Sequence, residues 1–569
     1  MPDSLTSSVD FSSLRADTAS DGTLPIVAPL AVDDATVQWS ERCDVLVVGC
    51  GAAGAATAIS AREGGAAVIV VDRFDGGGAS AKSGGVVYAG GGTRHQLKAG
   101  YEDTPAAMFQ YLCREVGDAV SEATLRRFCD DSRGLLEWLE SIGAAFESNA
   151  PPPKTSYPKN GVYLYYSGNE SVGGYAEYAK PAPRGHRMND TGMSGKALYA
   201  VLRRKVESLQ IPILLQSAVQ RLVTDAKTGA VIGAEVLRFT AGSAAETRHR
   251  KLMQRAENLH NVAPGAADRA RARALALMLA EAKPQLLRAA RGVVLATGGF
   301  IFNRTLVERY APKYLKTMRL GATGCDGSGL RLGQSVGAGS ARLDKVSAWR
   351  FINPPTPWAR GMVVDAQGQR FCNEQSYGAR LGVEMCERHG GRAWLVLDAK
   401  LRRQAFREAL FGRLWAFQSI PAIFLMLFAP RARGIEQLAQ RIGVPSAALQ
   451  KTWQDYNAAA QGKHSDALGK TAPMMQALQQ PPFFAFEISA HSKSFPCPAI
   501  TLGGLRVDER SGAVLDTQGH AISGLYATGR AAVGIASNNY VSGLSLADCL
   551  WSGRRSGRHL AAAVASKQI

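Results

Sequence analysis

Three glycines at positions 49, 51 and 54, followed by an aspartate at position 72, have the spacing needed to bind a dinucleotide. Gly49 allows a tight turn, Gly51 lets the backbone approach a pyrophosphate, and Gly54 permits close packing of a helix on a strand. An acid at this distance can bind ribose hydroxyls, and a helix N-terminus favours the phosphates. The pattern predicts a dinucleotide site formed by Gly49, Gly51, Ala52, Ala53, Gly54 and Asp72.

The residues around these glycines predict the elements that would position them. Residues 43–48 (CDVLVV) form an apolar, β-branched run typical of a strand that is buried on both faces. An alanine-rich segment through Arg62 predicts a helix, and residues 67–71 predict a second strand that ends at Asp72. This is the order of elements that a dinucleotide site requires. The alternative is a glycine-rich turn in an α/β protein that binds no ligand.

Three further glycine-containing segments extend the expected site along the chain. Residues 76–85 (GGGASAKSGG) predict a loop of backbone amides and hydroxyls that lies along a phosphate or a flavin ring. Residues 292–299 and 524–530 each predict a strand that ends in glycine. Strands of one nucleotide domain at both ends of the chain indicate that an inserted domain interrupts it. This arrangement favours a flavoprotein over a protein that binds only NAD.

The composition is that of a large globular protein. The chain has 569 residues, of which 46% are hydrophobic and 20% charged, so it can bury a large core. Its formal net charge is +18, but residues 248–291 and 400–433 carry +13 of it, so we expect no nucleic-acid partner. Nine cysteines without a CxxC pair or a Cys/His cluster predict reduced thiols, no metal site and a cytoplasmic location. The polar first forty residues show no secretory signal.

An uncharged segment at residues 414–429 (LWAFQSIPAIFLMLFA) predicts contact with a membrane surface. It is too short to span a bilayer core of about 30 Å, and Pro421 interrupts it. Arginines flank it on both sides and can contact lipid phosphates. We therefore expect residues 400–433 to attach the protein peripherally to an anionic membrane surface, which for a cytoplasmic protein is the inner membrane. The alternatives are a buried helix of the cap and a contact between subunits.

Taken together, these motifs resemble the fumarate reductase and 3-ketosteroid dehydrogenase family of flavoproteins. The resemblance rests on the Gly49 motif, residues 79–85, residues 297–299, Gly529-Arg530 and residues 543–548 (GLSLAD). It covers residues 41–566 apart from the two basic insertions, and it implies FAD bound in an extended pose beneath a cap domain. Besides the first glycine motif, the FAD contacts that it implies are Arg73, Ala79, Ser80, Ser83, Gly84, Gly85, Val219, Thr297, Gly298, Asp326, Gly529, Arg530, Ser545 and Leu546.

The fold class that follows is α/β: a Rossmann-like FAD-binding domain interrupted by an inserted α+β cap domain that carries substrate and catalytic residues. A disordered leader is expected at 1–40. The expected domains are the first part of the FAD-binding domain at 41–341, with a basic helical insertion at about 240–291, the cap at 342–493, with the basic-apolar insertion at about 400–433, and the second part of the FAD-binding domain at 494–569.

The segment 539–544 (NYVSGL) distinguishes between branches of this family. It lacks the arginine with which fumarate reductases clamp a dicarboxylate. It also lacks the Pro-Gly-Gly-Gly run that follows the tyrosine in steroid Δ1-dehydrogenases. Tyr540, Ser542 and the residues after them are instead similar to the 3-ketosteroid Δ4-(5α)-dehydrogenases. Residues 370–377 (RFCNEQSY) and 165–170 (YYSGNE) add to this similarity.

The resemblance implies dehydrogenation of 3-keto-5α-steroids, with a double bond introduced between carbons 4 and 5. Tyr540 would hydrogen-bond the carbon 3 ketone and stabilise an enolate, and Ser542 would take the proton from carbon 4. The hydride from carbon 5 would go to the flavin. Tyr377 would relay the proton toward solvent, and we expect it to be tyrosinate-like because a serine hydroxyl is a weak base.

Two alternative functions remain open at the level of sequence. One is Δ4-3-ketosteroid reduction, or Δ1-dehydrogenation, on the same scaffold. The other is a membrane-bound flavin electron carrier without steroid turnover, in which the side chains of Tyr377 and Ser542 would not converge. Tyr163, Tyr165 and Tyr166 are expected either to line an apolar substrate channel or to pack in the core. The expected partners are a steroid, an electron acceptor such as a quinone, and the membrane surface.

Overall fold

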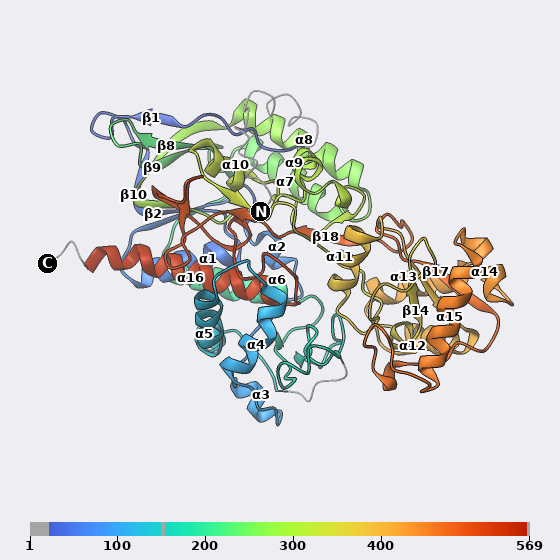
Figure 1. The fold of residues 1–569 in the computed structure, drawn as a ribbon. Coiled ribbons are helices and arrows are strands. Elements are labelled where there is room, and N and C mark those ends of the chain that lie inside the picture. The colour runs from blue at the N-terminus through green and yellow to red at the C-terminus, as the bar shows by residue number, and fades with distance from the viewer. Residues whose placement is uncertain (1–21, 149–153, 566–569) are drawn as a thin grey trace.

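A nine-stranded sheet, here called the central sheet, forms the core of the larger lobe of the structure, a computed structural model that describes residues 22–148 and 154–565 (Figure 1). Its strands run in the order β1-β8-β9-β10-β2-β3-β7, and β21 pairs with β10 and β20. Their bounds are β1 Leu30–Val32, β2 Glu41–Val48, β3 Val68–Val71, β7 Ile213–Leu214, β8 Ser217–Asp225, β9 Val231–Arg238, β10 Lys283–Leu295, β20 Ala513–Leu515 and β21 Ala521–Ala527.

The parallel part of this sheet combines both ends of the chain. Strand β2 pairs in parallel with β3 and β10, and β21 pairs in parallel with β10, with Val293 opposite Leu525. The four residues of β3 are buried, as are the last four of β2, because helices cover both faces of a parallel sheet. The C-terminal strand thus returns to the sheet that the N-terminal glycine motif begins. This confirms the predicted α/β fold class.

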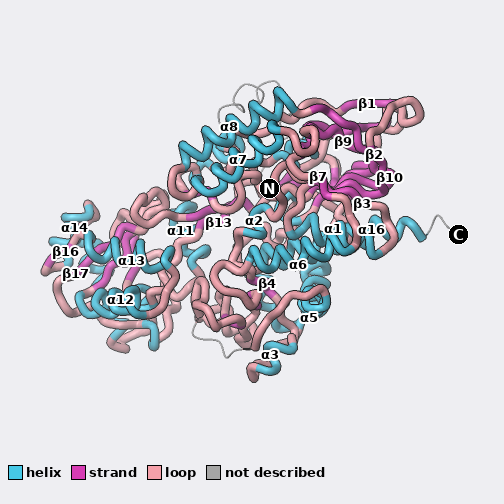
Figure 2. The backbone as a smooth tube through the Cα atoms, turned by 180° about the vertical axis from the view of Figure 1, so that it is seen from behind, coloured by secondary structure: helices cyan, strands magenta, loops and turns pink. Residues whose placement is uncertain are grey.

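Two layers of helices cover the central sheet (Figure 2). On one side α1 packs against α16, and a Cβ added at Gly553 of α16 would lie 2.5 Å from the carbonyl oxygen of Ala53. Small residues are therefore required where these two helices touch. The helices around the sheet are α1 Ala52–Glu63, α2 Gly78–Ala81, α6 Gly195–Ser208, α7 Ala244–Leu259, α8 Pro264–Glu281, α9 Arg304–Tyr310, α10 Ser328–Ser335 and α16 Leu544–Ala565.

Two further groups of elements flank the central sheet (Figure 1). One group, below the central sheet, combines a small sheet, β4-β6-β5, with three helices: β4 Val86–Tyr88, β5 Leu164–Tyr165, β6 Gly185–Arg187, α3 Arg94–Lys98, α4 Pro105–Val116 and α5 Glu122–Ser141. The other group, here called the cap lobe, contains the antiparallel sheet β14-β15-β17-β16 and five helices: β14 Met362–Val364, β15 Trp394–Leu397, β16 Arg431–Ala432, β17 Phe483–Glu487, α11 Gly378–Arg388, α12 Ala399–Phe411, α13 Ala416–Phe428, α14 Ile435–Ile442 and α15 Ser446–Ala460.

Short strands lead from the central sheet into the cap lobe. In one three-stranded sheet β18 lies between β11 and β13, and in a two-stranded sheet β12 pairs with β19. The bounds are β11 Met318–Arg319, β12 Ser340–Ala341, β13 Val346–Ala348, β18 Pro498–Thr501 and β19 Gly504–Leu505. Strands β11 and β13 belong to the segment that leads into the cap lobe, and β18 belongs to the segment that returns from it. Hydrogen bonds therefore join the two segments at the start of the cap lobe.

Two expectations about insertions and termini need correction. The expected disordered leader, residues 1–40, is wrong for its described part: β1 pairs in parallel with β8, and Leu24 is buried. Residues 1–21 lie outside the described residues. The basic insertion at 240–291 is helical only as far as Glu281, because β10 begins at Lys283 and pairs with β9.

The basic-apolar insertion at 400–433 folds as two helices and a short strand. It comprises most of α12, all of α13 with Pro421 inside it, and β16, which pairs with β17. In residues 22–148 and 154–565, no helix combines the length and hydropathy needed to cross a bilayer.

Candidate active site

The segment that carries Tyr540 and Ser542 lies immediately before α16 and against β4. Tyr88 N–H donates to the carbonyl of Gly543, 3.2 Å away. Gly543 has φ +90°, and an added Cβ would lie 2.8 Å from the Tyr88 nitrogen. A side chain at this position would be strained in its backbone and would collide with β4. Gly543 therefore holds the preceding serine and tyrosine in place.

The structure brings Tyr377, Tyr540 and Ser542 together from two distant parts of the chain. The rings of Tyr377 and Tyr540 are stacked, with centroids 6.4 Å apart and an interplanar angle of 22°. Ser542 lies close enough to the Tyr377 side chain to influence its pKa, and its Oγ lies 3.3 Å from the hydroxyl of Tyr165. The arrangement is thus a group of three phenols and one alcohol, of which Tyr540 is half-buried and the other three are buried.

Tyr165 is a functional candidate that the sequence left open between channel lining and core packing. It lies at the end of β5 and is fully buried, yet its hydroxyl points to Ser542. The signal was present in the YYSGNE segment, but no local pattern distinguishes the tyrosine that faces the serine from its neighbours. Pairing of β5 with β6, and of β6 with β4, decides this orientation.

Burial determines the protonation of these phenols. Burial raises the pKa of Tyr377 well above its usual range, nearby Tyr540 and Tyr165 raise it further, and the hydrogen bond with Ser542 opposes this. Burial also raises the pKa of Tyr540, against the effect of Arg530. Both side chains are therefore protonated at neutral pH. The expected tyrosinate-like Tyr377 is wrong for this state, because an ionised phenol would lack solvation.

Aromatic side chains that the sequence analysis did not select surround the two tyrosines. The ring of Trp349 lies 4.9 Å from that of Tyr540, and the ring of Phe351 lies 5.3 Å from that of Tyr377. Both belong to the stretch that follows β13 into the cap lobe. Rings of this kind provide apolar contact area beside a few polar groups, the combination that binds a small, largely apolar ligand.

A lysine next to Tyr377 is a second group that was not predicted. Lys154 Nζ donates to the Gln375 carbonyl and lies 5.9 Å from the centre of the Tyr377 ring. Burial lowers the pKa of Lys154 to about 7, while Glu170 and Glu115 oppose the shift. This amine therefore changes charge near neutral pH beside the group of tyrosines.

The first glycine motif lies at the turn between β2 and α1. A Cβ added at Gly54 would lie 1.9 Å from the Gly49 carbonyl oxygen, so this position accepts only glycine. A Cβ at Gly51 would meet only Ser80 Oγ and the Gly77 oxygen, at 3.7 and 3.8 Å. Asp72, beyond β3, accepts hydrogen bonds from the backbone nitrogens of Cys50 and Phe74 at 2.7 and 2.9 Å.

The serine-rich loop lies directly against this turn. Ser80 Oγ accepts a hydrogen bond from Ala52 N at 3.1 Å, at the first residue of α1. Ser83 Oγ donates to the Ser80 carbonyl at 2.7 Å and accepts from Gly85 N at 3.1 Å. The loop therefore holds its hydroxyls and amides beside the N-terminus of α1, where partial positive charge attracts phosphate. Of the predicted contacts in this loop, Ser80 touches the first glycine motif directly, and Ser83 is bonded to Ser80 and Gly85.

Arg73 and Asp326 bind one another. Arg73 Nη1 lies 2.8 Å from Asp326 Oδ2, and the same oxygen accepts a hydrogen bond from Leu24 N at 3.3 Å. Although burial alone would raise the pKa of Asp326, Arg73 and Arg331 lower it to about 2. The carboxylate is ionised at neutral pH and joins three segments. Val219, in β8, is buried in the sheet.

The remaining predicted contacts lie at the ends of β10 and β21 and at the start of α16. Thr297 Oγ1 accepts a hydrogen bond from Gly329 N at 3.1 Å, and Gly298 and Gly529 have φ values of +79° and +59°. Arg530 Nη1 is buried and has no hydrogen-bond partner among the described residues. Ser545 and Leu546 are buried in the first turn of α16.

These residues fit a dinucleotide cofactor. The space at Gly51, the N-terminus of α1 and the unpartnered Arg530 nitrogen together offer close backbone approach, phosphate-binding amides and a donor that lacks an acceptor.

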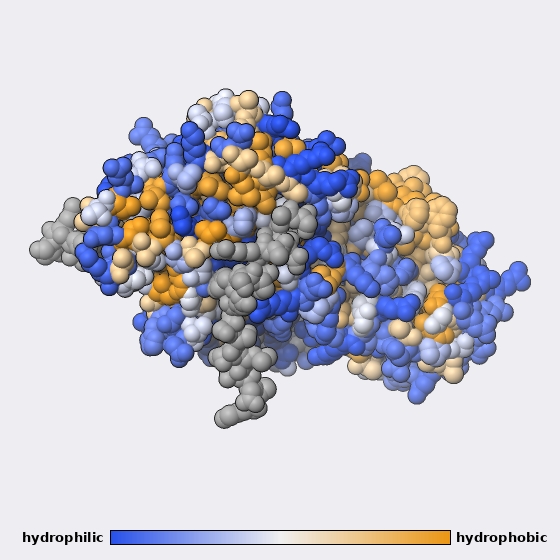
Figure 3. Space-filling model, turned by 90° about the horizontal axis from the view of Figure 1, so that it is seen from above, coloured by the Kyte–Doolittle hydropathy of each residue, from blue (hydrophilic) through white to orange (hydrophobic). Residues whose placement is uncertain are grey.

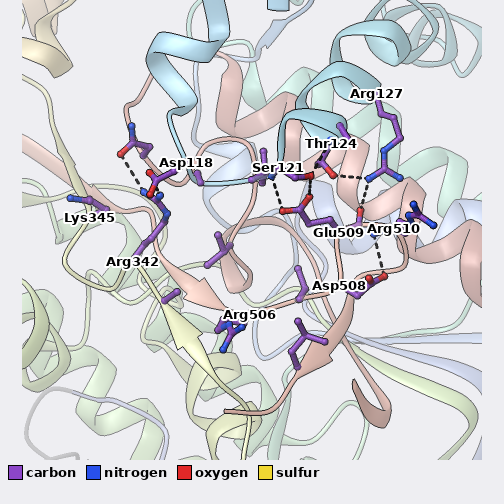
Figure 4. Close-up of a pocket in the computed structure, with 18 of the residues that line it drawn as sticks. Asp118, Ser121, Thr124, Arg127, Arg342, Lys345, Arg506, Asp508, Glu509 and Arg510 are labelled. Carbon is purple, nitrogen blue, oxygen red and sulfur yellow. Dashed lines mark hydrogen bonds and ion pairs between the residues drawn. The ribbon is translucent and has the colours of Figure 1, made fainter. Parts of the chain in front are cut away.

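A separate charged cavity of about 1260 Å³ lies near the start of α5 (Figure 4). Arg342 pairs there with Asp118, and Glu509 accepts a hydrogen bond from Ser121 N at 2.9 Å. None of the sequence-predicted site residues lines it in the described part of the chain. Asn538, two residues before Tyr540, is on its wall.

Comparison with known proteins identifies the family to which this chain belongs. Residues 44–546 match the family described as FAD binding domain. The 3-oxo-5-alpha-steroid 4-dehydrogenase of Comamonas testosteroni is 46% identical over 505 residues, which cover 87% of this chain and 93% of that protein.

Two solved structures are also similar. The 3-ketosteroid-Δ4-(5α)-dehydrogenase from Rhodococcus jostii RHA1, in complex with 4-androstene-3,17-dione, has a TM-score of 0.79 and 29% identity, and the match covers 94% of this chain and 100% of that one. The 3-ketosteroid Δ1-dehydrogenase from Sterolibacterium denitrificans has a TM-score of 0.65 and 20% identity, covering 92% of this chain and 100% of that one. The second likeness concerns the fold alone.

Proposed function

Because the chain belongs to the FAD-binding flavoprotein family that includes the 3-oxo-5-alpha-steroid 4-dehydrogenases, we propose that it dehydrogenates 3-keto-5α-steroids between carbons 4 and 5. The cofactor is FAD. The observation that carries the proposal is the likeness over nearly the whole chain to a relative with this activity, together with a buried group of hydroxyls able to act on a ketone. The electron-carrier alternative is disfavoured because Ser542 and Tyr377 lie in one group with Tyr165 and Tyr540.

The reaction removes a proton and a hydride from neighbouring carbons. FAD, when bound, supplies the acceptor for the hydride from carbon 5. Tyr540, whose phenol stays protonated, donates a hydrogen bond to the carbon 3 oxygen and stabilises its developing negative charge. This hydrogen bond acidifies carbon 4, from which Ser542 takes the proton.

Proton transfer away from Ser542 is the step that the neighbouring phenols assist. A serine hydroxyl can accept a proton only as it loses its own. Tyr377, which lies next to Ser542, would take the serine proton and pass its own phenol proton on toward solvent. The Tyr165 hydroxyl, 3.3 Å away, holds Ser542 Oγ in position.

Replacing the Tyr540 hydroxyl tests its role as the donor to the ketone. In Tyr540→Phe we expect kcat to fall by about 10²- to 10³-fold, as expected for loss of one donor to a developing oxyanion. Steady-state kinetics with a 3-keto-5α-steroid measure the effect. Tyr526→Phe, in β21, is the matched control and should retain wild-type kcat. A Tyr540→Phe enzyme within threefold of wild type would remove Tyr540 from the mechanism.

The activity itself can be assayed directly. Purified holoenzyme is incubated with 5α-androstane-3,17-dione and an artificial electron acceptor, and formation of the conjugated enone is followed in the near ultraviolet. We expect a product with the mass of 4-androstene-3,17-dione. If no enone forms, the proposal is wrong. The reductase alternative is tested by incubating the enone with a reduced electron donor. The Δ1-dehydrogenase alternative is tested by analysing the products of the dehydrogenation assay for a 1,2-unsaturated ketone.

We also propose that residues 400–433 attach the protein to an anionic membrane surface. Seven of the twelve exposed large hydrophobic side chains in the described residues lie between Leu410 and Phe428, with exposed fractions of 76% for Phe411 and 70% for Phe428. Figure 3 shows hydrophobic areas on this lobe beside strongly hydrophilic ones. Arg403, Arg407 and Arg413 are exposed around α12 and α13 and can contact lipid phosphates.

The contacts of Glu408, the acidic residue within 400–433, also indicate that the apolar and cationic side of this segment faces the membrane. Glu408 does not face the exposed arginines: its carboxylate accepts hydrogen bonds from Thr356 N, at 3.0 and 3.1 Å. The exposed side therefore combines apolar and cationic groups, as in helices that lie in the plane of a membrane interface. Attachment would place the protein beside membrane quinones, which we propose as its electron acceptor.

The membrane proposal is tested by changing exposed apolar side chains together. For Phe411→Ser/Ile420→Ser/Phe428→Ser we expect vesicle binding to weaken at least about 10-fold, because each side chain contributes roughly 1 kcal/mol or more when it enters an apolar phase. Co-sedimentation with phosphatidylglycerol vesicles measures this. Val262→Ser is the control, because Val262 is an apolar side chain outside this segment and is 84% exposed. Unchanged vesicle binding, or dissociation of a dimer instead, would contradict membrane attachment.

A further inference from the structure

A short bridge, residues 167–170, contacts both segments that carry the proposed catalytic groups. On one side, Ser167 Oγ donates to the Ser542 carbonyl at 3.0 Å, and Ser542 N donates to the Ser167 carbonyl at 3.3 Å. On the other side, the side chain of Asn169 accepts a hydrogen bond from Tyr377 N, with 2.6 Å between nitrogen and Oδ1. The bridge therefore links the segment before α16 to the start of the cap lobe.

The contact at Tyr377 occurs at a structurally sensitive point. Tyr377 is the N-cap residue of α11, and its own side chain caps no backbone amide. Its N–H would be buried without a partner if Asn169 were absent, because Tyr377 is 2% exposed. The Asn169 carboxamide thus satisfies a buried donor and sets where α11 begins. The position of the Tyr377 phenol follows from that start.

Asn169 is itself held in one orientation by α4. Its Nδ2 donates to Glu115 Oε1 at 2.8 Å, and its backbone nitrogen donates to the Tyr111 hydroxyl at 2.9 Å. Tyr111 in turn donates to Glu115 Oε1 at 3.0 Å. Asn169, Glu115 and Tyr111 are 1–2% exposed, so no water competes for these bonds. The carboxamide cannot flip without losing both of its partners.

Glu115 also contacts the chain just before Tyr540. Its backbone carbonyl accepts hydrogen bonds from Asn539 N and Asn538 Nδ2, each at 3.1 Å. One residue of α4 therefore holds Asn169 through its side chain and the segment of Tyr540 through its backbone. Glu115 therefore contributes to holding the two stacked tyrosines relative to one another.

We infer that Asn169, oriented by Glu115, is a positioning residue that holds Tyr377 in register with Ser542 and Tyr540. The inference rests on the proposed function, since it concerns the proton transfer from Ser542 to Tyr377. Proton transfer needs donor and acceptor within hydrogen-bond reach, and a shift of about 1 Å can cost about 10²-fold in rate. The effect should fall on kcat rather than on KM, because the Ser542–Tyr377 transfer matters in the transition state.

Three variants test the two hydrogen bonds of the Asn169 side chain. Asn169→Leu removes both hydrogen bonds at similar volume, and we expect kcat to fall by about 10- to 100-fold with KM changed less than about threefold. Asn169→Asp keeps an acceptor for Tyr377 N but places a carboxylate against Glu115. It should lower kcat as well. Adding Glu115→Gln to Asn169→Asp restores a donor between the two side chains, and kcat should return to within about fivefold of wild type.

A buried asparagine in the cap lobe provides the matched control. Asn457 in α15 accepts a hydrogen bond from Leu478 N at 2.6 Å and donates to the Leu478 carbonyl at 3.2 Å, far from the group of tyrosines. Asn457→Leu should lower the melting temperature, with kcat of the folded enzyme near that of wild type. Flavin absorbance and melting temperature are recorded for every variant.

The outcomes distinguish this inference from the proposed function. If the wild-type holoenzyme does not turn over 5α-androstane-3,17-dione, the proposed function is wrong. If the wild type is active and Asn169→Leu keeps its kcat, the inference is wrong. Should Asn169→Leu not fold, Asn169→Asp with and without Glu115→Gln decides: equal kcat in these two folded, FAD-containing enzymes overturns the positioning role.

Discussion

Ser542→Ala is expected to lower kcat on 5α-androstane-3,17-dione by about 10³-fold or more while leaving the flavin absorbance of the protein unchanged. The Ser542 hydroxyl lies 3.3 Å from the Tyr165 hydroxyl and beside the Tyr377 side chain. Alanine leaves the phenols in place but removes the atom that takes the proton from carbon 4. Stopped-flow reduction of the bound flavin by substrate, followed by its absorbance, measures the chemical step directly.

Ser537→Ala is the matched control for this prediction. Ser537 is buried in the same segment, 3% exposed, and its hydroxyl bonds only to backbone: it donates to the Leu502 carbonyl at 2.7 Å and accepts from Gly534 N at 2.9 Å. We expect a loss of stability of about 1 kcal/mol with kcat unchanged. A Ser542→Ala enzyme that reduces its flavin at the wild-type rate would show that another group is the base.

The second large effect is expected at Gly51. In Gly51→Ala we expect FAD affinity to fall by at least about 100-fold, or about 2.7 kcal/mol, while the melting temperature of the apoprotein stays close to wild type. The added methyl meets only ordinary contacts in the protein, at 3.7 and 3.8 Å, and its backbone angle suits alanine. It occupies the surface that a pyrophosphate must approach. Titration of apoprotein with FAD, followed by flavin fluorescence, measures the change.

Gly54→Ala gives the contrasting result. Its added methyl would lie 1.9 Å from the Gly49 carbonyl, so the turn between β2 and α1 must distort and stability falls together with FAD binding. The two variants separate a glycine needed by the cofactor from one needed by the fold. A Gly51→Ala protein that binds FAD as tightly as the wild type would contradict our placement of the pyrophosphate.

Local patterns were sufficient to predict the β2–turn–α1–β3 unit. Its strands are short apolar runs, its turn consists of glycines, and its helix is rich in alanine, so every preference acts within about thirty residues. The long strand β10 was recognised only from Gly292 onward. Its first half pairs with β9 after the chain has passed through α7 and α8, and no local sequence pattern indicates this pairing.

Strand β1 shows the same limit more clearly. Residues 30–32 follow a polar stretch and carry no strong strand signal, yet they pair with Val223, Thr224 and Asp225 of β8. The partner lies almost two hundred residues away. Sheet edges of this kind depend on contacts that form only when the rest of the sheet is present.

The sequence by itself determined the chemistry available to this protein: a glycine turn able to bind FAD, and a tyrosine and a serine two positions apart in a segment typical of steroid dehydrogenases. Only the tertiary structure decided which hydroxyls meet. Tyr165, Tyr377 and Ser542 lie at least 165 residues apart in the chain, so their approach depends on strand pairing, on the glycine at 543 and on the carboxamide of Asn169. It also decided the direction in which the pKa of Tyr377 is shifted, because that pKa depends on burial, and burial belongs to the folded chain.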